Sequence, residues 1–250
     1  RRVTSVRTSW FNFLSDRSSP REEVWEVAQR VESHGPVQVD EYTILIAALG
    51  RSRSWQRSLD TLERARAMHH DVRPFNAALK ACKLSSRWDL SVHLLSEIRQ
   101  SCLSPDAVSY SMAITACGEA TVPSTQPGRR RPEPRPQWEL ALRLFEEADG
   151  PTLRDNNYPL HCAMAVCGKG GAWQRALWLF ATECTAPQVS AVGYGTAIGA
   201  CAQAFEWRMA VHLFDKSLSH GFDPHLKSYY GVIAAFASST LWAQALSVFE

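Results

Sequence analysis

Residues 194–214, YGTAIGACAQAFEWRMAVHLF, hold the pattern that decides the fold. Here Trp207 follows the aromatic residue Tyr194 by thirteen positions. A small residue stands three positions after the tryptophan, an aliphatic residue four positions after it, and Phe214 seven positions after it. Because residues with this spacing share one face of an α-helix, the part that begins at Trp207 is predicted to be an amphipathic helix.

The same spacing recurs through the chain and defines an internal repeat. Four further pairs have a tryptophan thirteen positions after an anchor residue: Tyr42 and Trp55, Phe75 and Trp88, Leu160 and Trp173, and Tyr229 and Trp242. Tyr110 and Trp138 make another pair when an insertion of fifteen residues between them is set aside. Six of the nine tryptophans therefore occupy one position of a repeat of about 33–35 residues.

Two other positions of the repeat each carry one kind of residue. Seven positions after the anchor stand Leu49, Cys82, Cys117, Cys167, Cys201 and Phe236. Three positions after the tryptophan stand Ser58, Ser91, Ala141, Ala176, Ala210 and Ala245, which are all small. We expect both positions to be core, and we expect the tryptophans to be buried between the two helices of their repeats rather than exposed for base stacking. Because the sequence has no CxxC pair, neither a disulfide framework nor a zinc site is expected.

The segments before each tryptophan, such as YGTAIGAC from Tyr194, are short and apolar, and their composition alone fits a strand or a helix. The repeat length favours a helix, because each segment has to pack on the helix that follows it within the same repeat. A helical hairpin of this size cannot bury its apolar face alone and stacks on its neighbours. The sequence therefore predicts an all-α protein, an α-solenoid (right-handed superhelix) of tandem helix-turn-helix repeats.

The repeats divide the chain into two parts. Residues 42–250 are predicted to form the repeat array, and residues 1–41 an N-terminal segment with a partial repeat, in which residues 20–33 look like a second helix. Neither end has a polar capping helix, so we expect the array to continue in a longer natural chain. The first thirteen residues contain three arginines and no acid, which is typical of an organellar transit peptide or of the solvated end of a fragment.

One repeat is interrupted by residues 121–137, TVPSTQPGRRRPEPRPQ. The Pro, Gly and Ser content predicts an irregular, projecting loop. This insertion is also the most basic segment of the chain, with Arg129, Arg130, Arg131 and Arg135. Two interpretations stay open: the arginines bind RNA phosphates from the edge of the solenoid, or the loop is a solvated insert without a role.

Composition and motifs exclude several function classes. With 45% hydrophobic residues, 21% charged residues and a formal net charge of +2, the chain does not have the charge of a general polyanion binder, although a basic stripe on one face is compatible with it. No apolar run approaches the ~20 residues needed to span a bilayer. The sequence has no Gly-rich phosphate loop, nucleophile elbow or HExxH motif. We therefore expect no enzymatic activity, no metal and no cofactor within these residues.

In the segments SPDAVSY from Ser104, SYSMAITAC from Ser109 and WQRALWLF from Trp173, the repeat resembles the pentatricopeptide repeat (PPR) family. That family has a tyrosine early in the first helix, an A-L…L-F run in the second helix, and Pro-Asp before the next repeat. The Cys-ended first helix and the Trp-opened second helix are similar to a Trp- and Cys-rich PPR-like variant from certain single-celled algae. The resemblance covers roughly residues 20–250. Tetratricopeptide repeats fit less well, because their tryptophan opens the first helix.

The resemblance implies that the first helices line a concave surface and that each repeat reads one RNA base. The reading residues would be the one after the anchor and the one four positions before the next anchor. In this chain the pairs are Thr43 with Asp71, Asn76 with Asp106, Ser111 with Asn156, His161 with Ser190, and Gly195 with His225, and Tyr230 stands alone. The first three pairs have the usual polar types of the family and would suggest G, U and A in turn. The last two pairs depart from the pattern, and an alternative is that all these positions are plain helix-start and linker residues.

The implied function is single-stranded RNA binding in the processing, stabilisation or translation of an organellar transcript, in a mitochondrion or in a chloroplast or other plastid. The implied partners are that RNA and other proteins at the solenoid surface, with no membrane. The alternative is a protein-protein interaction scaffold, for example a structural component of an organellar ribosome. The near-neutral charge and the two departing pairs favour this alternative.

Overall fold

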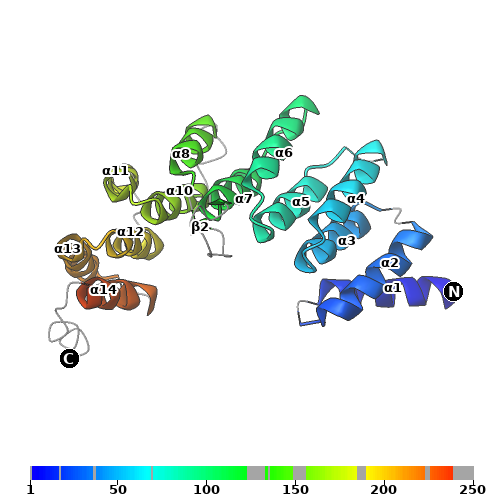
Figure 1. Cartoon of the computed structure of the whole chain (residues 1–250), viewed down its shortest axis with the longest axis horizontal. Helices are drawn as coiled ribbons and strands as arrows, with labels where there is room; N and C mark the ends of the chain where they lie inside the picture. The colour runs from blue at the N-terminus through cyan, green and yellow to red at the C-terminus, as the bar shows by residue number, and fades with distance from the viewer. Residues whose placement is uncertain are drawn as a thin grey trace, which may run out of the picture. The chain divides into compact units, whose positions relative to one another are not determined.

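The computed structural model of the chain describes residues 2–16, 18–35, 38–68, 70–122, 133–134, 136–148, 156–184, 190–222 and 226–238. The chain divides into two compact units, residues 1–116 and residues 117–250, and each is described by itself. Apart from one short pair of strands, the regular structure of the described residues is helical (Figure 1). No described helix combines the length and the apolar character that a membrane span requires.

The helices follow the repeat pattern. The first unit contains α1 (Arg2–Ser15), α2 (Arg21–His34), α3 (Val39–Arg51), α4 (Trp55–Met68), α5 (Arg73–Leu84), α6 (Trp88–Gln100) and the start of α7 (Ala107–Gly118). The second unit contains the end of α7 and α8 (Trp138–Glu147), α10 (Tyr158–Lys169), α11 (Trp173–Cys184), α12 (Ala191–Gln203), α13 (Trp207–Ser219) and α14 (Leu226–Ser238). The second helices α4, α6, α8, α11 and α13 each begin at the tryptophan of their repeat. The all-α solenoid of tandem helical hairpins is thus confirmed, whereas its right-handed superhelical path stays a prediction.

The predicted core positions are buried. The small residues Ser58, Ser91, Ala141, Ala176 and Ala210 are inaccessible to solvent. The cysteines seven positions after the anchors are equally buried, and the loss of hydration raises the pKa of their thiols, to about 11 for Cys82 and about 12 for Cys117. These thiols are therefore packing groups.

The tryptophans are less buried than the sequence predicted, and two of them contact the next repeat. Trp173 and Trp207 are half-buried. The ring of Trp207 lies 5.7 Å from the ring of Phe236 on α14, in the next repeat. Trp138 lies so close to Gly170 that a Cβ there would be 2.5 Å from its Cδ1 atom. From the first turn of their second helices, Trp207 and Trp138 thus reach the following hairpin.

Successive first helices pack directly on one another within each unit. In the first unit α3 packs on α5, and in the second unit α10 packs on α12 and α12 on α14 (Figure 1). A Cβ added to Gly50 would lie 2.6 Å from the Cβ of Ala81, and one added to Gly168 would lie 2.7 Å from the Cβ of Ala200. Only glycine allows the backbones to approach this closely. Within each unit, neighbouring first helices therefore pack closely toward their C-terminal ends.

The turn inside each hairpin has a common geometry. The residue two positions before the tryptophan has a positive φ: 62° at Arg53, 55° at Ser86, 75° at Gly171 and 63° at Phe205. The backbone N–H of the next residue then donates to the carbonyl seven positions after the anchor, for example Ala172 to Cys167 at 2.9 Å. These bonds satisfy carbonyl groups that the end of the first helix leaves without an intrahelical partner.

The insertion preserves this turn and is more regular at its base than the sequence predicted. The N–H of Gln137 donates to the carbonyl of Cys117 at 2.9 Å, which is the same bond across the inserted segment. Strands β1 (Thr121–Val122) and β2 (Glu133–Pro134) pair antiparallel, with Val122 opposite Glu133. Both of these residues precede a proline, which favours extended backbone. Residues 123–132 lie outside the described residues.

Gly171→Ala should destabilise the chain by about 1–2 kcal/mol, because its φ of +75° is strained for alanine although the space around it is open. Gly199→Ala is the matched control, since Gly199 also has open space but lies in α12 with ordinary helical φ. That change should stabilise the chain by about 0.5–1 kcal/mol. Urea unfolding of both variants is the measurement, and equal effects would contradict the turn geometry.

Deleting residues 121–135 together with Pro136→Gly should shift the melting temperature little, because it restores the length of an uninterrupted repeat and loop length has a weak entropic cost. The deletion that keeps Pro136 is the control. It should be clearly less stable, because proline at the position equivalent to Gly171 cannot take a positive φ. A large loss in both variants would show that the insertion supports the fold.

Candidate nucleic-acid interface

The candidate reading residues lie at the N-terminal ends of the first helices. The residue after each anchor is in the first turns of its helix: Thr43 in α3, Asn76 in α5, Ser111 in α7, His161 in α10, Gly195 in α12 and Tyr230 in α14. The linker residues Asp71, Asp106, Asn156 and Ser190 stand one or two positions before the next first helix. His225, Arg129, Arg130, Arg131 and Arg135 lie outside the residues whose side chains the structure describes.

Asn76 and Asp106 are brought into direct contact. The amide nitrogen of Asn76 donates to the two carboxylate oxygens of Asp106, at 3.2 and 3.1 Å. The hydroxyl of the buried Ser109 lies 2.6 Å from the amide oxygen of Asn76, to which it can donate, and 2.9 Å from the Oδ1 atom of Asp106. The Asn76 amide is therefore held between Asp106 and Ser109.

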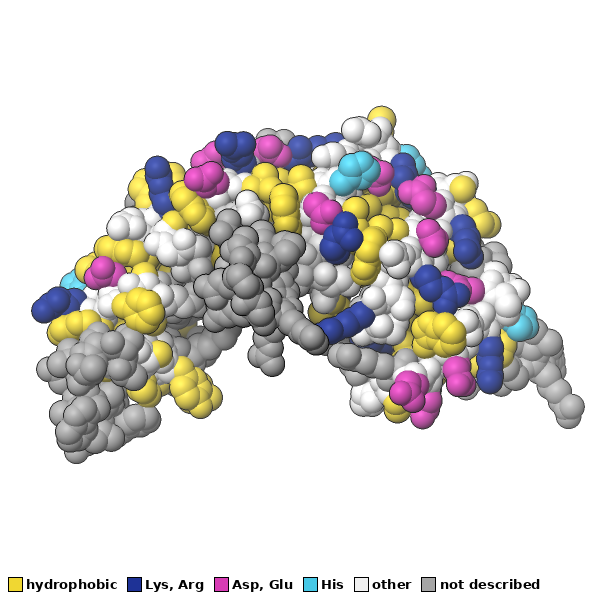
Figure 2. Space-filling model, in the orientation of Figure 1, with side chains coloured by type: hydrophobic (Ala, Val, Ile, Leu, Met, Phe, Trp, Pro, Cys, Tyr) yellow, Lys and Arg dark blue, Asp and Glu magenta, His cyan; other side chains and the backbone are white. Residues whose placement is uncertain are grey.

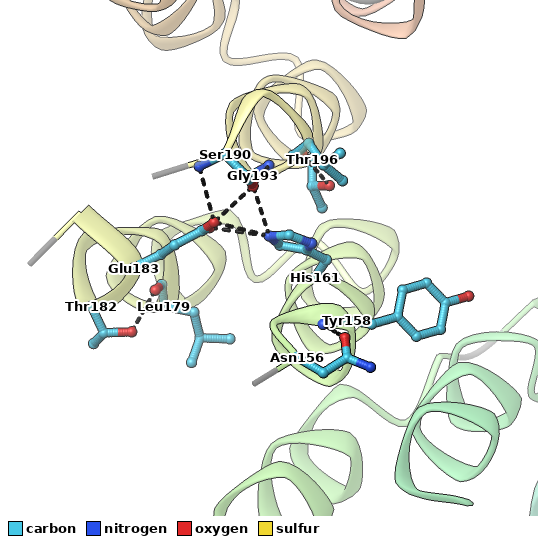
Figure 3. A network of polar contacts seen from close by, with 10 residues as sticks. Asn156, Tyr158, His161, Leu179, Thr182, Glu183, Ser190, Gly193 and Thr196 are labelled. Carbon is cyan, nitrogen blue, oxygen red and sulfur yellow. Dashed lines mark hydrogen bonds and ion pairs between the residues drawn. The ribbon is translucent and has the colours of Figure 1, made fainter. Parts of the chain in front are cut away.

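His161 and Ser190 are also brought together, through a third residue that sequence reasoning missed. The Nε2 atom of His161 lies 3.2 and 3.1 Å from the two carboxylate oxygens of Glu183 on α11 (Figure 3). The Ser190 hydroxyl donates to the same carboxylate at 2.8 Å. Burial alone would raise the pKa of Glu183, but the hydrogen bonds from His161 and Ser190 outweigh it and lower that pKa.

The other two polar pairs make mostly local contacts. The hydroxyl of Thr43 donates to the Val39 carbonyl of its own helix at 2.8 Å. Asp71 pairs with Arg73 at 2.8 Å. Ser111 is buried and donates to the carbonyl of Ala107, also within its helix. The hydroxyls of Thr43 and Ser111 are thus bonded to the backbones of their own helices. The pairs Thr43 with Asp71 and Ser111 with Asn156 are therefore less well formed for base readout than Asn76 with Asp106.

Gly195 and Tyr230 line an apolar cavity of about 910 Å³ on α12 and α14. Tyr230 is 63% exposed, and Phe205 at the rim is 69% exposed. None of the described residues that line the cavity is charged. The lining therefore offers no cation to the phosphates of an RNA backbone. This cavity suits an apolar partner better than RNA.

The linker residues also accept hydrogen bonds at the helix starts, a role that the sequence pattern could have indicated. Ser190 is the N-cap residue of α12, whereas Asp71 and Asn156 stand one position before the N-cap residues of α5 and α10. Asp71, Asp106, Asn156 and Ser190 each accept a hydrogen bond from a backbone N–H in the first turn of the next helix, at 2.7–3.0 Å. Asp, Asn and Ser are the preferred residue types at such positions. Helix capping alone therefore explains why these residue types stand there, and any RNA contact would be an additional use of them.

Charge and metal-binding groups add little to the site. On the face drawn in Figure 2, acidic and basic side chains are interspersed. Ion pairs of the first unit include Arg66 with Glu97 and Arg87 with Asp89. Among the described residues, no group of three His, Cys, Asp or Glu side chains is arranged to hold a metal ion. The described candidate residues can therefore contribute mainly hydrogen bonds to a ligand.

Comparison with known proteins identifies the repeat. The family model described as PPR repeat matches residues 192–222, which contain α12 and α13. The chain therefore contains a PPR repeat, and the resemblance inferred from the sequence is confirmed there. No curated protein sequence shows significant similarity to the chain.

Two solved structures illustrate the structural likeness. One is the pentatricopeptide repeat protein PPR10 in complex with an 18-nt psaJ RNA element, with 18% identity, a TM-score of 0.46, and coverage of 97% of this chain and 39% of that one. The other is PPR10 from maize, with 20% identity, a TM-score of 0.45, and coverage of 92% and 36%. The chain thus spans about two fifths of the length of these proteins or less.

Asp71→Ala should destabilise the chain by about 1 kcal/mol without any RNA present, because the backbone N–H of Arg73 at the start of α5 loses its acceptor. Asp71→Asn keeps the acceptor and loses only an exposed ion pair with Arg73, so it should cost a few tenths of a kcal/mol. Urea denaturation midpoints distinguish the two. Equal losses would assign the effect to charge and contradict the capping role.

Proposed function

We propose that the chain binds single-stranded RNA along the N-terminal ends of its first helices, with Asn76 and Asp106 as the best-formed base-reading pair. The observation that carries this proposal is the contact between these two side chains in an array that contains a PPR repeat. The solved relative PPR10 was crystallised in complex with an RNA element.

The chemistry of the pair suits uracil. Asn76 offers an N–H donor, and Asp106 offers a carboxylate acceptor. Uracil presents an imino N–H beside a carbonyl oxygen, so one base can accept from Asn76 and donate to Asp106. The bond from Ser109 holds the Asn76 amide in position before RNA arrives. Such preorganisation reduces the entropy that binding loses.

Affinity along the RNA backbone would come from basic residues. The proposal assigns phosphate contacts to Arg129, Arg130, Arg131 and Arg135 of the insertion, whose base lies beside the turn between α7 and α8. The proposed RNA is an organellar transcript, bound during its processing, stabilisation or translation in a mitochondrion or plastid. The proposal includes no reaction, and the absence of enzymatic activity stays a prediction.

A protein-binding function is the second candidate, and the uncharged cavity around Gly195 and Tyr230 favours it. An exposed aromatic rim at Phe205 and Tyr230 is typical of surfaces that bury against another protein. In this alternative the array is a scaffold for a larger assembly such as an organellar ribosome. The two candidates use different repeats of the chain.

Asn76→Ala combined with Asp106→Ala should weaken binding to an RNA selected from a random pool by about 1–3 kcal/mol and relax preference at a single nucleotide. Gln56→Ala combined with Asp60→Ala is the control, because it removes the same chemical groups from the exposed side of α4 and should leave affinity unchanged. Fluorescence anisotropy with single-nucleotide RNA variants measures both.

Substituting Arg129–Arg131 with Ser should weaken all RNAs alike and reduce the salt dependence of binding, because these residues would release counterions from phosphates. Titrations at several salt concentrations provide the slope. If the unmodified chain binds no RNA at low salt and copurifies with a stable protein partner, the scaffold function replaces RNA binding.

A further inference from the structure

Glu183 stands where other repeats have a small or apolar core residue. It lies ten positions after Trp173, and the equivalent residues are Ala65, Ile98, Ala148 and Ser217, all buried. Glu183 is itself only 2% exposed. A carboxylate in a core position costs free energy unless hydrogen bonds compensate it. In this repeat, a buried hydrogen-bonded carboxylate therefore replaces the small or apolar side chain that packs at this position in the other repeats.

A second departure from the repeat makes room for that carboxylate. Gly193 stands one position before the anchor Tyr194, where the other repeats have Glu41, Pro74, Ser109, Pro159 and Ser228. A Cβ on Gly193 would lie 2.2 Å from the Oε2 atom of Glu183. The two departures fit each other in space, which indicates one arrangement rather than two separate changes.

The Glu183 carboxylate receives hydrogen bonds from two residues, Ser190 and His161. The Ser190 hydroxyl and the Ser190 backbone N–H both approach Oε1, at 2.8 and 3.3 Å, and His161 Nε2 approaches both oxygens. An ionised carboxylate can only accept hydrogen bonds. The Nε2 atom of His161 therefore carries a hydrogen, and in the neutral ring Nδ1 is left as an acceptor.

Ser190 is turned into an acceptor in the same way. Its hydroxyl hydrogen is directed to Glu183, and its oxygen accepts from the backbone N–H of Gly193 at 3.0 Å. The Ser190 hydroxyl can therefore accept a hydrogen bond from a further partner but has no hydrogen left to donate. Figure 3 draws the His161 ring with its second nitrogen turned away from Glu183, and the His161 side chain keeps 12% exposure where Glu183 keeps none.

We infer that Glu183 is a positioning residue that fixes His161 as the Nε2–H tautomer, so that His161 and Ser190 present two acceptors and no donor to an RNA base. The inference rests on the proposed RNA binding. Guanine is the base whose Watson–Crick edge offers two adjacent donors, the N1–H and the 2-amino group. The repeat of α10 and α11 therefore prefers guanine, although its residue pair departs from the usual types of the family.

Glu183→Gln tests the role of the charge. In this variant the two Ser190 donors would hold the amide oxygen, and the amide N–H would face His161 Nε2. The ring would then carry its hydrogen on Nδ1 and become a donor toward the base. Glu146→Gln, the same change at an exposed residue of α8, is the matched control.

The tautomer is measured without RNA, by nitrogen-15 NMR of the full chain labelled at histidine, at a pH of about 8 or above where imidazoles are neutral. His161 should be protonated at Nε2 in the unmodified chain and in Glu183→Gln at Nδ1, with Glu146→Gln like the unmodified chain. Protonation at Nδ1 in the unmodified chain would overturn the inference. This outcome is decided on the unmodified chain alone, so it does not depend on whether a variant folds.

Base preference is then measured on the selected RNA. Glu183→Gln should lower affinity for guanine about tenfold at one nucleotide, two positions away from the nucleotide that responds to Asn76 and Asp106. An unchanged preference at that nucleotide would overturn the role of Glu183 in reading. If no RNA binds to the unmodified chain, the proposed function fails, while the NMR result still decides whether Glu183 sets the tautomer.

Discussion

Direct packing of successive first helices is the contact on which the rest of the structure depends. At Gly50 against Ala81, and at Gly168 against Ala200, the backbones approach so closely that a side chain at the glycine would clash with the alanine. Both contacts lie toward the C-terminal ends of the first helices. At the opposite end, a residue in the first turn of one helix meets the linker residue before the next, as Asn76 meets Asp106.

The fold could be read from the sequence because its signals repeat. One tryptophan is weak information, but tryptophans at a fixed position in several repeats locate the start of each second helix, and the structure begins α4, α6, α8, α11 and α13 there. The burial of the tryptophans was predicted less well. A repeat pattern shows which residues share a helix face, but not whether that face meets the same hairpin or the next one, and Trp207 meets Phe236 of the next.

The candidate site was only partly predictable, for a related reason. The pairs Asn76 with Asp106 and His161 with Ser190 came from a family resemblance, and the structure places each pair in one hydrogen-bonded group. Glu183 belongs to no polar position of the repeat, so no pattern pointed to it. The sequence did contain a signal for Glu183, because it is a single acid at a repeat position where the other repeats have a small or apolar residue. The capping role of the linker residues could have been predicted from their types alone.

The central claim is that RNA lies along the N-terminal ends of the first helices. Photo-crosslinking of the full chain to RNA that contains 4-thiouridine or 6-thioguanosine, followed by mass spectrometry of the linked peptides, tests this most directly. The account predicts links in peptides from the starts of α5 and α10, around Asn76 and His161. Links confined to the second helices, such as α4 or α13, or no link to any RNA at low salt, would contradict it.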